Sequence, residues 1–134
     1  MRSAPAGFEH RAMVRANKPQ RSAQPLVLDI AHLRRYTLGD RGLEREILDL
    51  FVEQLPKTIV ALKTAAVDRD WRMAAHTLKG SARAVGAHRL AMAAVAAEAI
   101  ADIQDRETCH GVIGRIEAAV AEIEAEVSRF SAQP

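Results

Sequence analysis

His76 lies at the centre of the residue pattern in this sequence that is best suited to chemistry. A helical period of about 100° per residue places His76 opposite Leu78, away from the apolar residues of segment 71–85. The same polar face carries three basic side chains and one glycine: Arg72, Lys79, Gly80 and Arg83. A solvent-facing neutral imidazole is a competent nucleophile near neutral pH. The cations around it would stabilise a phosphoryl group on the imidazole, or complement an acidic pocket on a partner.

Gly80 is an unusual residue for the interior of a helix, where glycine costs about 1 kcal/mol relative to alanine. A bare patch beside His76 would let another protein's surface approach the imidazole closely. The alternative interpretation is purely structural. A lone histidine is usually solvated or satisfied in a core, a helical glycine can mark close packing, and exposed Lys and Arg often only solubilise a face. Both interpretations stay open on these residues alone.

A longer run of residues around His76 resembles a known family signature. The run is Ala75-His76-Thr77-Leu78-Lys79-Gly80-Ser81-Ala82, continued by Val85-Gly86-Ala87 and Leu90. It is similar to the signature of histidine-containing phosphotransfer (HPt) domains. The upstream stretch Phe51–Pro56, with Leu62 and Asp70-Trp71, fits the same family, whereas Ala97 before Glu98 departs from its common Leu-Glu pair. The resemblance covers about residues 28–130.

The resemblance implies a function and its residues. His76 would be the phosphoacceptor, modified on Nε2, with Lys79 beside the phosphoryl group and Gly80 giving clearance. The phosphoryl group would arrive from the aspartate of one response-regulator receiver domain, or of a hybrid sensor histidine kinase, and leave to another receiver. The domain would hold no nucleotide, cofactor or kinase activity of its own, and the Mg²⁺ for transfer would belong to the receiver. Arg72 and Arg83 are added as partner-binding residues from the helical wheel alone.

Other chemistry finds weaker support in the sequence. No two of His32, His88 and His110 have the i, i+4 spacing of metal ligands on one helix, and the acidic residues Glu122, Glu124 and Glu126 look like a solvated flank. We find no Gly-rich phosphate loop, no Ser-His-Asp pattern and no interleaving of aromatic and basic residues typical of nucleic-acid binding. Cys109 is the only cysteine, which excludes an internal disulfide and a cysteine-based zinc site.

Apolar periodicity predicts an all-α fold with one short helix and four long ones. The short helix is expected over residues 30–36, capped by Asp29, and the long ones over 40–67, 71–85, 87–103 and 105–130. Asp70 and Asp105 are expected to cap the second and fourth long helices, and Gly86 to end the second. The stripe expected to be buried on the first comprises Leu43, Ile47, Leu50, Phe51, Leu55, Ile59 and Leu62. Such helices pack best as an antiparallel four-helix bundle, with the short N-terminal helix capping one end.

The composition of the chain limits which classes of protein it can belong to. The chain has 134 residues, 49% of them hydrophobic and 4% aromatic, with a net charge of +2. This length and hydrophobic content are enough for one packed domain, residues 26–134. The composition disfavours a β-sandwich and a membrane helix, and the small net charge gives no indication of nucleic-acid binding. Residues 1–25 hold five basic residues against Glu9 alone and three of the five prolines, which predicts a disordered basic tail. We expect a cytoplasmic monomer, without membrane or nucleic-acid contacts.

Two further functions compete with a stand-alone phosphorelay protein. One is a helical adaptor that docks a receiver or kinase without accepting phosphate. The other is the phosphoacceptor domain of a larger kinase. The intact combination of His76, Lys79 and Gly80 favours a transfer role over the adaptor, and the start methionine with its tail favours a stand-alone protein over a kinase domain.

Overall fold

The computed structural model describes residues 26–133, and all of its regular structure is helical. The elements are α3 (Ile30–Thr37), α4 (Arg41–Thr64), α5 (Asp68–Val85), α6 (His88–Glu98) and α7 (Arg106–Ala132). The tail predicted over residues 1–25 lies outside the described residues. Among the helices described, none is both long and apolar enough to cross a membrane.

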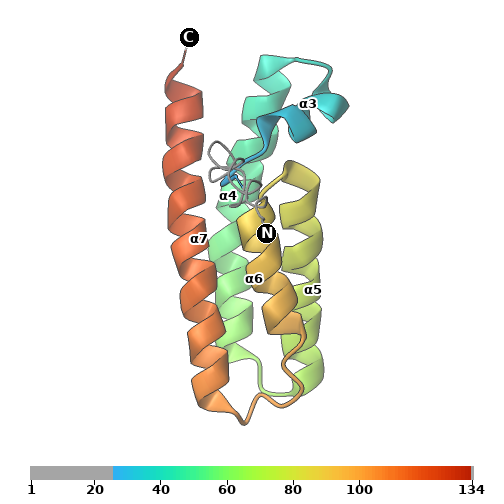
Figure 1. Ribbon diagram of the computed structural model, residues 1–134, viewed down its shortest axis with the longest axis vertical. Helices are drawn as coiled ribbons and strands as arrows, with labels where there is room; N and C mark the ends of the chain where they lie inside the picture. The colour runs from blue at the N-terminus through green and yellow to red at the C-terminus, as the bar shows by residue number, and fades with distance from the viewer. Residues whose placement is uncertain (1–25, 134) are drawn as a thin grey trace, which may run out of the picture.

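The four long helices form a bundle in which neighbours run in opposite directions (Figure 1). Helix α4 packs against α5 and α7, and α6 packs against the same two helices. The short helix α3 lies across the end of the bundle where α4 begins, in contact with α4 and α5 (Figure 1). The all-α fold and the helical bundle with a short N-terminal helix are therefore confirmed.

Local capping explains several helix ends that the sequence predicted. The Asp29 side chain accepts from the His32 N–H at the start of α3, and Asp105 does the same for Thr108 at the start of α7. At the end of α5, Gly86 adopts a left-handed conformation with φ of 80°. This conformation suits glycine because it has no Cβ.

The buried stripe of α4 differs from the predicted one. Leu43 and Leu50 are exposed, whereas Leu48 and Glu44 are fully buried. In an α-helix, Leu50 lies about 100° around the axis from the buried Phe51. The buried positions therefore continue toward the start of α4 through Leu48 and Glu44, and Glu44 is an acidic residue in this otherwise apolar row.

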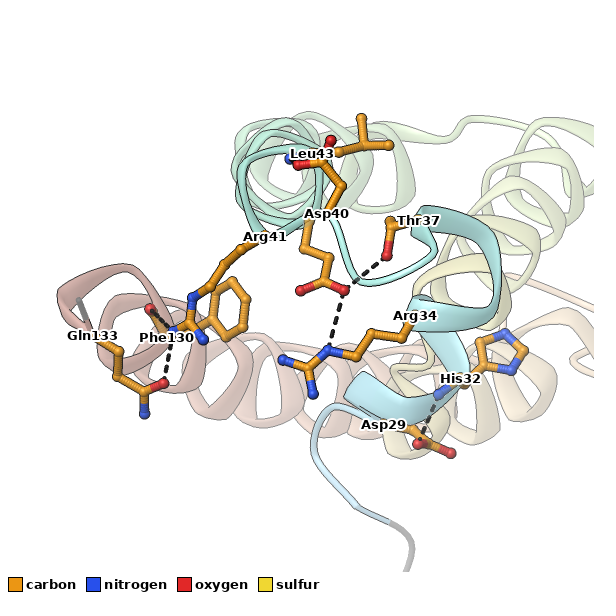
Figure 2. A network of polar contacts seen from close by, with 10 residues as sticks. Asp29, His32, Arg34, Thr37, Asp40, Arg41, Leu43, Phe130 and Gln133 are labelled. Carbon is orange, nitrogen blue, oxygen red and sulfur yellow. Dashed lines mark hydrogen bonds and ion pairs between the residues drawn. The ribbon is translucent and has the colours of Figure 1, made fainter.

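Burial of Glu44 is possible because α3 brings it polar partners. Its Oε2 accepts from the Thr37 hydroxyl at 2.7 Å and from Arg34 Nε at 3.2 Å. Figure 2 shows Arg34 and Thr37 pointing toward the same carboxylate, while Arg41 lies over the Phe130 ring near the end of α7. These contacts fix α3 and the first turns of α4 at one end of the bundle.

Three other predicted boundaries were wrong. Helix α4 ends at Thr64 rather than Val67, and α5 begins at Asp68 without a side-chain cap, so Asp70 is not its N-cap. Helix α6 ends at Glu98 rather than Ile103. Tertiary hydrogen bonds favour these ends, because Asp68 accepts the N–H of Ile103 from the α6–α7 connection, at 2.9 Å.

Candidate functional site

Helix α5 presents His76 to solvent because most of its apolar residues, though not the exposed Met73 and Ala84, fall on the opposite face. Every member of that face is buried except the half-buried Ala74, and the buried ones are Trp71, Ala75, Leu78, Ala82 and Val85. The predicted orientation is thus confirmed: the His76 side chain is 68% exposed.

One carboxylate from the neighbouring helix joins two residues of this exposed face. Glu98 is the last residue of α6, and its Oε2 lies 2.8 Å from His76 Nδ1. Its other oxygen, Oε1, accepts from Lys79 Nζ at 2.6 Å. The sequence pattern placed His76 and Lys79 together but did not assign Glu98 a role.

The contact with Glu98 sets the proton on the imidazole. An ionised carboxylate only accepts hydrogen bonds, so the nitrogen facing it, His76 Nδ1, must carry the hydrogen. In the neutral ring the lone pair then belongs to Nε2. The ring therefore offers its nucleophilic nitrogen away from Glu98, on a side chain that is mostly open to solvent.

Glu98 is held in its charged form by the same contacts. The hydrogen bond from Lys79, followed by that from His76, lowers the pKa of the Glu98 carboxyl below its usual range. Both partners favour the charged form because they donate to it. The Glu98 carboxylate is therefore ionised at neutral pH.

Removing Lys79 tests this arrangement. We expect Lys79→Ala to raise the pKa of Glu98 toward its ordinary value, since the largest cause of the lowering is gone. A carboxyl with a lowered pKa in the folded state stabilises the fold above its unfolded-state pKa, and this contribution is lost as pH falls through the folded-state value. Acid unfolding of Lys79→Ala should therefore begin at higher pH. An NMR titration of the Glu98 side-chain carbonyl measures the shift, and an unchanged pKa would show that Lys79 does not set it.

Helix packing positions Glu98. The indole Nε1 of Trp71 donates to the carbonyl of Ala97 at 2.7 Å, immediately before Glu98. Small buried residues line both helices at their contact, among them Ala75 on α5 and Ala94 on α6. Their size permits close approach of the two backbones, which brings the end of α6 within reach of His76.

The remaining predicted residues lie where the helical wheel put them, with one difference. Arg72, Gly80 and Arg83 are exposed on α5. A Cβ built on Gly80 meets no atom within 4 Å, so packing inside the domain does not require this glycine. Lys79 differs because its side chain is only 19% exposed and is paired with Glu98. The Glu98 carboxylate from α6 therefore reduces the repulsion between Lys79 and the other cations of this face.

An apolar groove flanks the site on the side of α4. It has a volume of about 370 Å³ and is lined in part by Ala61, Met73 and Thr77, the last of these next to His76. Met73 is 62% exposed. An exposed methionine in an apolar groove is typical of a surface that contacts another protein.

Glu98 could have been found from the sequence by one signal. It is the only acidic residue in α6, a helix otherwise made largely of alanine and other apolar residues. The other histidines of residues 26–133 form no comparable site. His32 and His88 lie with ring centroids 5.9 Å apart near Asp29, and within residues 26–133 no group of three suitable side chains could hold a metal ion.

Comparison with known protein families gives a match over most of the bundle. The family model described as the Hpt domain matches residues 46–128, which include most of α4, all of α5 and α6, and most of α7. Both His76 and Glu98 lie within the matched segment. No curated protein and no solved structure matches the chain.

Proposed function

The chain belongs to the Hpt domain family, whose members act in histidine phosphotransfer in two-component systems, and we propose that it relays a phosphoryl group between receiver-domain aspartates through His76. One observation carries the proposal: an exposed imidazole whose Nδ1 faces a carboxylate at 2.8 Å. That contact leaves Nε2 as the nucleophile. Receiver domains, free or within a hybrid sensor histidine kinase, are the proposed partners, and the cytoplasm is the proposed location.

The transfer step follows from this geometry. The lone pair of His76 Nε2 forms a bond to the phosphorus of an aspartyl phosphate, and the bond from phosphorus to the aspartate oxygen breaks. The aspartate leaves as a carboxylate, while Nδ1 keeps its hydrogen toward Glu98. The imidazole gains positive charge as the new bond forms, and the Glu98 carboxylate stabilises that charge. Donation to a second receiver is the same step in reverse.

The other residues of the face have supporting roles. Phosphoryl transfer requires mainly positioning and neutralisation of charge, and Lys79 supplies a cation one helical turn from His76. The exposed Arg72 and Arg83 act in encounter with an acidic receiver pocket, where rim charges mainly change association rates. Mg²⁺ for each transfer belongs to the receiver.

Substituting Glu98 tests the electrostatic part of the mechanism. Glu98→Gln keeps an oxygen that can accept from Nδ1 but removes the negative charge. A hydrogen bond to a charged group is stronger than a neutral one by about 1 kcal/mol, so we expect transfer at saturating receiver to slow by about fivefold. Single-turnover transfer rates measure this effect. Glu117→Gln, on the exposed surface of α7, is the matched control, and equal rates in the two variants would contradict the role of Glu98.

Substituting Gly80 tests the docking patch. Gly80→Gln should fold at least as well as the parent, because the helix gains up to about 1 kcal/mol in propensity and the space outside the Cβ is open. The longer side chain should nevertheless obstruct the receiver and weaken docking by about tenfold or more. Docking is measured as the receiver concentration that gives half-maximal transfer.

The matched control for Gly80 is on α7. Gly111 is also exposed inside a long helix, and a Cβ there meets no atom within 4 Å. Gly111→Gln should therefore gain similar stability and leave docking unchanged. If Gly80→Gln and Gly111→Gln transfer alike, Gly80 is not part of the docking surface.

A two-step transfer assay tests the relay itself. The chain is incubated with a receiver domain labelled by acetyl phosphate, separated from it, and then presented to a panel of unlabelled receivers. A relay protein accepts label in the first step and donates it in the second. A docking adaptor binds receivers but never becomes labelled, which would contradict the proposal. A domain that receives label only from a kinase and never from a receiver would also contradict it.

A further inference from the structure

A cavity lies at the far end of the bundle from α3, between the end of α4 and the first turns of α7. Its volume is about 440 Å³, within the range of small-molecule sites of about 300–1,000 Å³. Apolar side chains form its walls: Leu62, Trp71, Ile103, Cys109 and Ile113. All five are buried, and four exposed charged or polar residues also line the cavity: Lys63, Arg106, His110 and Glu117.

Gly114 on α7 helps to keep the cavity open. It lies inside a long helix, where glycine costs about 1 kcal/mol relative to alanine. A Cβ built on Gly114 would meet no atom within 4 Å, so close helix packing does not require a glycine at this position. Gly114 lines the cavity, and any larger side chain would take up part of its space.

Within the part of the chain that the structure describes, one cation lining the cavity forms no ion pair. Lys63 and Glu117 form an ion pair with each other at 2.8 Å. Arg106 also lines the cavity, and no carboxylate of residues 26–133 lies within 4.0 Å of its guanidinium nitrogens. An exposed guanidinium beside buried apolar side chains is complementary to a carboxylate attached to an apolar body.

Three aspartates near the cavity do not pair with Arg106, and each accepts a backbone N–H instead: Asp68, Asp102 and Asp105. Burial raises the pKa of the lining Cys109 thiol most, the charges of these aspartates raise it further, and Arg106 lowers it. None of the three aspartates lines the cavity. The lining residues alone therefore carry a net positive charge at neutral pH.

We propose that this cavity binds a small amphipathic carboxylate, with its apolar body against Trp71 and Ile113 and its carboxylate on Arg106. This site shares no residue with the exposed face around His76. Trp71 lines the cavity and also donates to the Ala97 carbonyl of α6. The proposal therefore does not rest on phosphotransfer.

Octanoate is a suitable probe, and the chain supplies the reporter. Trp71 is the only tryptophan, so intrinsic fluorescence reports on the cavity directly. Octanoate added to the full chain should change the Trp71 emission saturably, and 1-octanol should bind about tenfold more weakly because it lacks the charge. No saturable change would overturn the site, and equal affinity of the two probes would overturn the assigned ligand class.

Three variants locate the binding. Gly114→Leu should abolish the octanoate response by filling the cavity, while Gly111→Leu, on the same helix but outside the lining, should retain it. Arg106→Gln should weaken octanoate about tenfold, to the level of 1-octanol, and leave 1-octanol unchanged. Equal octanoate binding by the two leucine variants would overturn the assignment. His76→Gln should bind octanoate normally, so failure of the phosphotransfer proposal and failure of this one are distinguishable.

Discussion

We expect His76→Gln to abolish phosphoryl acceptance while the bundle stays folded. Glutamine has no nucleophilic ring nitrogen, and the replaced side chain is 68% exposed and outside the core. Substitutions at such positions change the free energy of unfolding by about 0.5 kcal/mol or less. Transfer from a labelled receiver and urea unfolding measure the two quantities.

His110→Gln is the control for this substitution. His110 is exposed on α7, and no carboxylate of the described part of the chain lies within 4.0 Å of its ring nitrogens. The His110 variant should therefore accept phosphate at the parent rate. Label that persists on His76→Gln would identify another acceptor and contradict the assignment of the site.

Gly86→Ala should strongly destabilise the bundle. Gly86 has φ of 80°, which costs about 1–2 kcal/mol for a residue with a Cβ. The added Cβ would also lie 2.7 Å from the backbone oxygen of Asp29, and crowding of this kind costs about 1–3 kcal/mol. The free energy of unfolding in urea should fall by about 2–5 kcal/mol as the contact between α3 and the α5–α6 turn opens.

Gly39→Ala separates the two causes. Gly39 has a similar φ of 84°, but a Cβ added there would meet no atom within 4 Å. Its substitution should therefore cost only the backbone term of about 1–2 kcal/mol. Equal losses in the two variants would show that the contact with Asp29 contributes nothing.

Residue patterns predicted those features that depend on local geometry. The exposed face of α5 follows from the helical period, and the caps at Asp29 and Asp105 follow from side chains that bond to the next turn. Gly86 ended its helix as expected because the left-handed conformation favours glycine. Each of these features depends on residues within a few positions of one another.

Side-chain contacts and helix ends that depend on the register between helices were missed. Glu98 is 22 residues from His76, and only the register of α5 against α6 brings their side chains together. The end of α6 was placed too late because the hydrogen bond from Trp71 to Ala97 and that from Ile103 to Asp68 come from tertiary structure. Burial of Glu44 required α3 to supply Thr37 and Arg34.

The position of the phosphoryl group on the imidazole tests the central claim most directly. The chain, labelled with ¹⁵N in its histidines, is phosphorylated by a receiver domain, and the coupling between ³¹P and the ring nitrogens is measured by NMR. We predict coupling to Nε2 of His76, with the hydrogen retained on Nδ1 beside Glu98. Phosphorus coupled to Nδ1, or to a different histidine, would contradict the account.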